Sequence, residues 1–461
     1  MLYVKTMTEF LVVLLIFLVS IIAMLICAVW KSSIHVKFWK LDFNMDSFFI
    51  GPFCGAIIVL LFGLIPLSDA LKGLWSFSGL NPVGILTLFF SMVYISKYLD
   101  TTGFFQFCAI WSLSKSGKSS TKLYFIIYVV VSILTIFTSN DVVILTFTPF
   151  IHYFTKAAGI NPVPFLFGEF FAANTWSMIF IISNPTNVVL GTAFKISFSQ
   201  YAKAMILPSI VGGVSNCLIL FFLFRKNILQ EFKLNKELGD PMQHVRSKFD
   251  MYVALAFTSI TIFFMAVSST SWFKYEMWHV SGVMAATLLL YNIFNDIFLR
   301  NPKDPVKMKQ IFSTLPYPII PFLLSLFVLV NALKLKGFFT SIGEAVAPLA
   351  NINEPISITL FGVLSVLSAN ILNNIPMSVA YVPIIQATKN PPSLGAVYAA
   401  VVGSNLGANL TPLGALAGIM WLGILKSQKI HIGFMEFVKV GFIATPICFA
   451  CTMLPMVLMN K

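Results

Sequence analysis

The sequence predicts an all-α polytopic integral membrane protein. Apolar residues make up 58% of its 461 residues and charged residues only 10%, whereas a soluble domain carries about a quarter charged residues. The apolar residues also occur in runs long enough to cross a hydrocarbon layer about 30 Å thick as helix. These observations exclude a soluble enzyme, a disordered chain and a small disulfide-stapled domain. A pattern that recurs in both halves of the chain predicts how the helices are arranged.

Eight apolar segments have the length and composition of full membrane crossings. In chain order they are 10–30, 48–66, 80–97, 203–224, 250–270, 277–299, 312–334 and 434–457. The first segment is too long for the apolar part of a signal peptide and has no small-residue cleavage site after it. We therefore expect it to be retained as the first span.

Four further segments are apolar but carry Asn, Ser, Thr or Pro near their middle. Irregular backbone at membrane depth is tolerated only where protein covers it or where it lines a water-filled cavity. We expect 122–155 and 356–386 to be re-entrant hairpins, and 165–200 and 396–425 to be broken transmembrane helices. The chain would then make about ten full crossings.

The basic residues predict the orientation of the chain. The sequence has 30 Lys and Arg against 17 Asp and Glu, a net charge of +13. If the N-terminus lies outside, 19 of the 30 basic residues fall in cytoplasmic loops, six of them in 225–249, as the positive-inside rule requires. We predict a multi-pass protein of the cell membrane with both termini outside and loop 225–249 in the cytoplasm. The basic excess thus reports topology, and no nucleic-acid partner is expected.

The two halves of the chain share a pattern. Gly-Phe-Phe at 103–105 recurs 234 positions later at 337–339, and the same offset aligns Asn140 with Asn374 and Pro149 with Pro383. Each half has an odd number of crossings, so the second copy would enter from the opposite face. This predicts an inverted-topology repeat, the architecture of secondary transporters. The first copy would span 1–224, the cytoplasmic linker 225–249 and the second copy 250–461.

Asp141 stands at the expected tip of the first hairpin. A carboxylate well inside a bilayer costs a few kcal/mol, and such residues usually line a pathway or relay protons. Asp141 could also cap the helix expected over 142–150, and the two roles are compatible. The second tip carries the amides Asn373 and Asn374 and no acid. We therefore expect proton coupling at Asp141.

The two tips and the two breaks are expected to form one site lined by amides and hydroxyls. Free N–H groups at half-helix ends attract oxyanions or hydroxylated solutes, and free carbonyls suit Na⁺, although each Asn could instead satisfy the broken backbone. The candidate substrate- or ion-binding residues are Ser139, Asn140, Asp141, Asn174, Asn184, Thr186, Asn187, Asn373, Asn374, Ser404, Asn405, Asn409 and Thr411. We expect no catalytic residue, no metal site and no cofactor, with H⁺ or Na⁺ as coupling ion.

Other interpretations are disfavoured by the same residues. A membrane-embedded enzyme would need clustered His, Ser or acidic residues at one depth, and Asp141 stands alone. A passive channel would need a continuous polar lining. Lys97 and Glu169 lie toward the expected cytoplasmic ends of their segments, where snorkelling to the interface explains Lys97.

Five polar motifs lie in the hairpins and breaks. They are Ser139-Asn140-Asp141 with Leu145 to Pro149, Ala172-Ala173-Asn174-Thr175, Asn184-Pro185-Thr186-Asn187, Asn373-Asn374-Ile375-Pro376, and Leu406-Gly407-Ala408-Asn409-Leu410-Thr411-Pro412-Leu413-Gly414-Ala415-Leu416. With them the chain, from about residue 48 to its end, resembles the ion transporter superfamily and, within it, the arsenical pump membrane permease (ArsB) family. The last motif is the most specific, because those permeases carry a similar LGPxLTPIGSLA stretch followed by a Trp, here Trp421.

The resemblance implies proton-coupled export of arsenite or antimonite, sometimes with a separate ATPase subunit. Related branches carry citrate and other dicarboxylates with Na⁺ or H⁺, or exchange Na⁺ for H⁺ as the NhaD-type antiporters do. Near neutral pH arsenite is largely an uncharged trihydroxide, which amides, hydroxyls and one carboxylate can hold, whereas citrate would meet Asp141 unfavourably unless that group were neutralised. We rank arsenite export first, carboxylate transport second and cation exchange third. The expected surroundings are a lipid bilayer and a small-molecule or inorganic oxyacid substrate; an ATPase subunit and a homodimer stay open.

Overall fold

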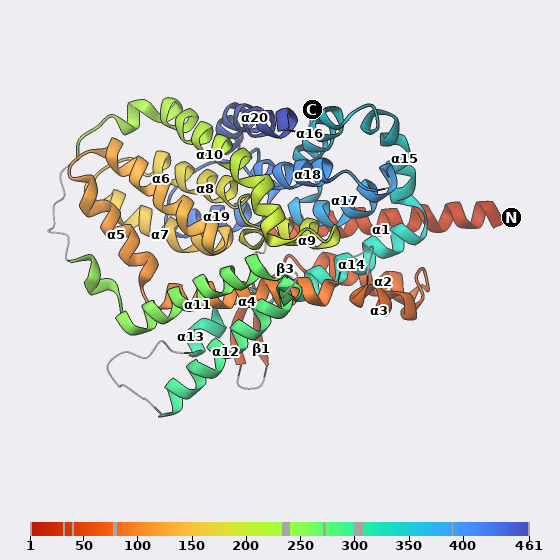
Figure 1. The fold of residues 1–461 in the computed structure, drawn as a ribbon, viewed down its shortest axis with the longest axis horizontal. Coiled ribbons are helices and arrows are strands. Elements are labelled where there is room, and N and C mark those ends of the chain that lie inside the picture. Colours follow the sequence, from red (N-terminus) through yellow and green to blue (C-terminus); the bar gives the residue numbers. More distant parts are fainter. Residues whose placement is uncertain are drawn as a thin grey trace.

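Helices build almost the whole fold (Figure 1). The computed structural model describes residues 2–30, 33–38, 41–76, 81–232, 240–270, 273–298, 308–389 and 391–459. These residues form twenty α-helices, three short 3₁₀ turns and two small antiparallel hairpins, β1–β2 (Ser33–Phe38, Leu41–Asp46) and β3–β4 (Ser269–Thr270, Phe273–Lys274). The predicted all-α fold class is confirmed.

The first ten helices run from the N-terminus to the middle of the chain. They are α1 (Leu2–Trp30), α2 (Ile50–Leu61), α3 (Leu67–Trp75), α4 (Pro82–Thr101), α5 (Phe104–Ser116), α6 (Ser120–Phe137), α7 (Asn140–Ala158), α8 (Val163–Trp176), α9 (Pro185–Ala193) and α10 (Phe198–Ile228), with η1 (Ile181–Ser183) between α8 and α9.

The remaining helices repeat much of this order after a 3₁₀ turn, η2 (Pro241–His244). They are α11 (Lys248–Val267), α12 (Met277–Phe298), α13 (Met308–Ser313), α14 (Ile319–Leu335), α15 (Phe338–Ala350), α16 (Glu354–Leu372), α17 (Asn374–Thr388), α18 (Leu394–Gly407), α19 (Leu416–Ser427) and α20 (Phe434–Met459), with η3 (Pro412–Gly414) between α18 and α19.

Eight helices of the described residues are long and apolar enough to cross a membrane. They are α1, α4, α6, α10, α11, α12, α16 and α20, and the pair α14 and α15, bent by 70°, would make a ninth. The expected uninterrupted span 48–66 is wrong: α2 ends at Leu61, and Gly63 turns the chain with a positive φ of 64°. The multi-pass character follows from the other helices.

Helical hairpins lie at both predicted places, and both predicted helix breaks are present. Because α6 and α16 are long and apolar enough to cross a membrane, the re-entrant character of the hairpins stays a prediction. α6 and α7 form the first hairpin with residues 138–139 as its tip, and α16 and α17 form the second with Asn373 as its tip. The breaks span 177–184 between α8 and α9 and 408–415 between α18 and α19. Asn184 caps α9, since its Oδ1 accepts the Thr186 amide at 3.1 Å, and a proline follows it at the first helical position.

The two sets of helices repeat in detail. α5 and α15 each start one residue after a glycine with positive φ, Gly103 at 87° and Gly337 at 79°. α7 and α17 each begin with an asparagine, Asn140 and Asn374, and the two broken helices match at an offset of 231 residues. The division into 1–224, 225–249 and 250–461 stays a prediction. Of that linker, α10 already includes residues up to 228, and residues 233–239 lie outside the described part.

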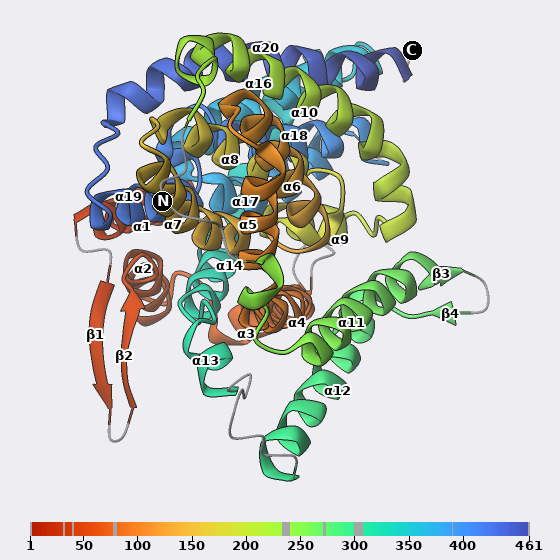
Figure 2. The same ribbon diagram turned by 90° about the vertical axis from the view of Figure 1, so that its left-hand side faces the viewer.

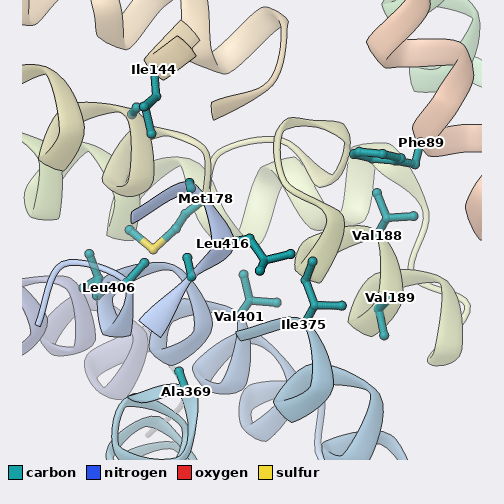
Figure 3. Packing of buried hydrophobic residues seen from close by; sticks show 14 of the residues in the cluster. Phe89, Ile144, Met178, Val188, Val189, Ala369, Ile375, Val401, Leu406 and Leu416 are labelled. Atoms are coloured by element: carbon teal, nitrogen blue, oxygen red, sulfur yellow. The ribbon is translucent and has the colours of Figure 1, made fainter. Parts of the chain in front are cut away.

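Helices from the first set pack against helices from the second set, so the two sets do not form separate bundles. α9 packs on α17 and α19 packs on α7, while α2 packs on α14 and α12 on α4. Figure 1 shows α19, late in the chain, among α6, α7 and α8, and Figure 2 shows α11 and α12 on the side of the molecule away from α10 and α20. Apolar side chains fill the centre: Val401 of α18, Leu416 of α19 and Ile375 of α17 all belong to the buried apolar cluster (Figure 3). This interlocking brings both hairpin tips and both breaks to the middle of the molecule.

Candidate functional site

A cavity of about 720 Å³ lies between the two hairpin tips. The first tip contributes Ser139, Asn140 and Asp141, the second contributes Asn374, and the first break contributes Asn184. The other walls come from α4, α19 and the segment 312–319, which leads into α14. The structure thus brings five of the thirteen candidate residues to one cavity.

Asp141 lies in the first turn of α7 and faces this cavity. α7 begins at Asn140 with Ser139 at the N-cap position, so Asp141 does not cap the helix. Within the described residues, its carboxylate has no hydrogen bond and no ion pair, although it is only partly exposed. The free N–H groups of the first turn favour a negative charge at this position. The carboxyl is therefore accessible to the cavity and uncommitted.

Three buried polar atoms at the two tips lack a hydrogen-bond partner among the described residues. They are Ser139 Oγ, Asn140 Oδ1 and Asn373 Oδ1. Leaving such a group unpaired costs about 1–3 kcal/mol, and the second tip is also strained, because Asn373 has a φ of 73°. Ser139 and Asn373 occupy equivalent positions in the two tips. Unsatisfied oxygens at both positions, together with the backbone strain at Asn373, are typical of a binding site.

Two asparagines at equivalent positions, 231 residues apart, tie the broken helices together. Asn174 Nδ2 donates to Asn409 Oδ1 at 3.1 Å, and Asn174 Oδ1 accepts from Asn140 Nδ2 at 3.1 Å. Asn405 Nδ2 donates to Asn187 Oδ1 at 2.7 Å, and its Oδ1 accepts from Asn184 Nδ2 at 2.8 Å. Each asparagine therefore reaches from the last turn of one broken helix into the other broken segment.

The remaining candidate residues lie in or beside this amide network rather than on the cavity wall. Ser404 Oγ donates to Thr186 Oγ1 at 3.1 Å. Thr411 Oγ1 donates to Asn370 Oδ1 at 2.7 Å, and Asn373 Nδ2 donates to the Leu413 carbonyl at 3.1 Å. In this conformation their hydrogen bonds hold the breaks and the second tip in place, the alternative role that the sequence left open.

Two charged residues on the cavity wall were not among the candidates. Asp46, at the end of β2, lines the cavity, and burial raises the pKa of its carboxyl above the ordinary value. Lys97 of α4 also lines it and is only 7% exposed. The snorkelling interpretation of Lys97 is wrong, because its ammonium lies 3.4 Å from Asp100 Oδ2 inside the protein.

Glu169 is the most enclosed acid of the described chain. It lies in α8 with no exposed surface, and Thr148 Oγ1 of α7 lies 3.0 Å from each of its carboxyl oxygens. Thr148 is two helical turns along α7 from Asp141. The sequence pointed to the end of a segment, whereas the structure places Glu169 in the protein interior beside the hairpin that carries Asp141.

Crossed broken helices, paired hairpins and a central cavity that carries charged and amide side chains on its wall define a secondary transporter. The chain belongs to the CitMHS citrate transporter family, whose model matches residues 49–396. The arsenical pump membrane protein of Escherichia coli is 25% identical over 86% of this chain and 90% of its own length. A putative arsenical pump membrane protein of Bacillus subtilis is 24% identical over 85% and 90%.

Solved structures of two transporters share the fold. The Alcanivorax borkumensis YdaH transporter, described as having an unusual topology, superposes with a TM-score of 0.57 at 13% identity over 98% of both chains. Neisseria gonorrhoeae MtrF, described with a class of antimetabolite efflux pumps, gives a TM-score of 0.53 at 12% identity over 98% of this chain and 95% of its own. The polytopic transporter fold predicted from the sequence is thus confirmed.

Proposed function

We propose that this transporter exports arsenite or antimonite in exchange for protons. The observation that carries the proposal is the first hairpin tip, where the uncommitted carboxyl of Asp141 stands beside the unpaired oxygens Ser139 Oγ and Asn140 Oδ1. The similarity to the arsenical pump membrane proteins favours the same solute.

The chemistry of the tip suits an uncharged oxyacid. Arsenous acid carries three O–H donors, and the hydroxyl and amide oxygens at the tip are acceptors without a donor. A few neutral hydrogen bonds bind weakly enough for release, which a carrier requires. Asp141 would take up a proton on one side of the membrane and release it on the other, because a carboxyl in this position is the residue type that relays protons.

The test is arsenite accumulation in everted membrane vesicles energised by a proton gradient. The wild type should accumulate arsenite, and an uncoupler should abolish the accumulation. Asp141→Asn keeps the size of the side chain but cannot ionise, so gradient-driven flux should fall to background. Glu344→Gln is the matched control, since Glu344 is exposed and lies outside the cavity.

Normal expression and an unchanged size-exclusion profile of Asp141→Asn would show that the variant is folded. Full gradient-driven flux in that variant would exclude Asp141 as the coupling residue. An absence of arsenite flux in the wild type would reject arsenite as the solute and leave the transporter assignment in place.

Carboxylate transport coupled to Na⁺ or H⁺ is the second candidate. It is favoured by the family and by the size of the cavity, which at about 720 Å³ exceeds what one arsenite requires. A screen with citrate in Na⁺ and in Na⁺-free medium tests it directly. Na⁺/H⁺ exchange ranks third, because the second tip carries Asn373 and Asn374 where an exchanger would favour another acid.

The finer features of the protein in the membrane belong to this proposal. We expect both termini outside and loop 225–249 in the cytoplasm, as the distribution of basic residues indicates. A separate ATPase subunit and a homodimer stay predictions. The substrate- and ion-binding role of the thirteen candidate residues also stays a prediction, with the five on the cavity wall as its first test.

A further inference from the structure

Lys97 places a positive charge on the wall that also carries Asp141. Among the described residues that line this cavity, Lys97 is the one cation, and the other charged residues are Asp46 and Asp141. We propose that Lys97 binds an anionic oxygen where the solute carries one, so that the cavity accepts carboxylates and oxyanions in addition to neutral solutes. The inference rests on the proposed function only in taking this cavity as the transport site.

The protein holds Lys97 in place through its own helix and the first hairpin. Asp100, one turn further along α4, lies 3.4 Å from the ammonium, and Thr146 Oγ1 of α7 donates to the same carboxylate oxygen at 3.3 Å. α4 and α7 also pack against each other. Lys97 is thus tied to the helix that carries Asp141, although the two residues are far apart in the sequence.

The ammonium of Lys97 has hydrogen-bonding capacity to spare. It carries three N–H donors, and its contact with Asp100 is the only one that the described residues provide. That contact, at 3.4 Å, is longer than the roughly 2.7–2.9 Å of a strong charge-assisted hydrogen bond. A solute oxygen can therefore take a donor from Lys97 without first breaking a tight ion pair.

Charge balance in the cavity explains why such a residue is needed. An anion that leaves water for a partly buried cavity requires a counter-charge. Asp46 and Asp141 on the wall, and Asp100 beside Lys97, repel an anion, and the amides at the tips supply only dipoles. Lys97 reduces this repulsion and supplies the donor that an anionic oxygen contacts, so its removal should weaken anion entry far more than entry of a neutral solute.

The experiment measures the charge preference of the cavity without assuming a substrate. A cysteine replaces Leu145, a partly exposed residue of the cavity wall, and reacts with an anionic (sulfonatoethyl) and a cationic (trimethylammonioethyl) methanethiosulfonate of similar size. Mass spectrometry of the peptide containing residue 145 gives both rates in the full-length protein in nanodiscs. With Lys97→Met, the ratio of the anionic to the cationic rate should fall about tenfold, as expected for the loss of one nearby charge.

Two controls separate the charge from a general disturbance. Lys97→Arg keeps a cation and should keep the ratio within about threefold. A second cysteine at Ser114, an exposed polar residue of α5 away from the cavity wall, serves as internal reference and should show an unchanged ratio in every variant. A ratio at residue 145 that is the same for Lys97→Met and Lys97→Arg would overturn the proposal, as would an equal change at position 114.

A second readout concerns the solute. Citrate should protect the cysteine at position 145 when Lys97 is present and in the Lys97→Arg variant. In Lys97→Met it should lose at least about tenfold in apparent affinity, whereas protection by arsenite should change little. Failure of arsenite transport would reject the proposed solute and leave the charge ratio intact. Citrate protection that is independent of residue 97 would reject the role of Lys97 even where transport is normal.

Discussion

At the scale of single residues, the amides have two different roles. Asn405 uses its whole amide: its Nδ2 donates to Asn187 Oδ1 and the Val401 carbonyl, with a longer contact of 3.3 Å to Ser404 Oγ, and its Oδ1 accepts from Ser177 Oγ and Asn184 Nδ2. It has no capacity left for a solute. Asn140 and Asn373, in contrast, keep an unpaired amide oxygen. The first kind maintains the broken backbone. The second kind keeps an acceptor for a solute, and in this conformation only Asn140 of the two lines the cavity.

We predict that Asn405→Leu destabilises the protein strongly. The substitution leaves the buried Nδ2 of Asn184 without a partner and leaves Asn187 Oδ1 with only a 3.5 Å contact to Thr186 Oγ1, at about 1–3 kcal/mol for each unsatisfied group. Thermal unfolding in detergent, followed by size-exclusion chromatography, should show a marked loss of stability. Asn351→Ala is the control, because Asn351 is exposed and donates one hydrogen bond to the Thr388 carbonyl. Equal stability of both variants would contradict a structural role for Asn405.

The residue types of the site were predictable from the sequence, but not which of these residues line the cavity and which hold the breaks together. Asparagines beside Pro and Gly in apolar segments predicted the tips and breaks, because those positions need hydrogen bonds that a helix does not supply. The sequence could not show that Asn184 and Asn374 reach the cavity whereas Asn174 and Asn405 do not. Lys97 was missed because a lone lysine near the end of an apolar run looks the same whether it faces lipid or a cavity. The structure decides between them, because Lys97 is buried and lines the cavity.

At the scale of elements, the second broken helix depends on small residues. α18 packs on the first arm of the second hairpin, α16, with very little space between them. A Cβ atom on Gly403 would lie 2.9 Å from the Gly362 carbonyl oxygen and would also meet the side chain of Ser365, and one on Gly407 would lie 2.9 Å from Ala369 Cβ. Close approach through small residues is how helices associate in membranes, and it sets the depth at which the break begins.

Gly403→Leu should therefore cost about 1–3 kcal/mol and disturb transport, because the side chain forces α18 away from α16. Gly423→Ala is the matched control in the same broken helix. A Cβ at Gly423 meets no atom within 4 Å, so the alanine should leave stability unchanged or raise it by up to about 1 kcal/mol. Thermal stability and flux of the two variants should diverge, and wild-type values for Gly403→Leu would refute the packing argument.

Element boundaries were predictable where a chemical signal marked them. Pro185 and Asn184 fix the start of α9, and the paired Gly103 and Gly337 fix the turns before α5 and α15. The expected span 48–66 failed because apolar composition continues through Gly63, although the chain turns there. Hydropathy alone does not report a turn that remains among apolar neighbours.

At the scale of the whole molecule, the repeat places two hairpin tips on one centre. The tips carry Ser139 and Asn373, each with an unpaired buried oxygen. Of these two residues, Ser139 lines the cavity in this conformation, whereas Asn373 is fully buried and does not. An inverted repeat predicts that the reverse arrangement exists when the site opens to the other side.

Cysteines at Ser139 and at Asn373 should therefore react with an impermeant maleimide from opposite sides of the membrane. Right-side-out and everted vesicles separate the two sides, and the transported solute should slow both reactions. A cysteine at the exposed Ser114 gives the reference for one-sided access. Labelling of both tips from one side only, with and without solute, would rule out alternating access around a common site.

The packing of α2 on α14 and of α12 on α4 also bears on how the protein is made. Two helices that pack on α4, α11 and α12, lie some 150 residues or more further along the chain, and α14, which packs on α2, follows it by more than 250 residues. A ribosome that has released only the first hairpin and the first broken helix has produced segments whose partners do not yet exist. Contacts between segments so distant in the sequence form late. Until then, these polar segments should stay in the translocon or be bound by a chaperone. Truncation anywhere before α19 would thus remove the helix that packs on α7. Quality control should degrade such chains, because the first half lacks its packing partners from the second half.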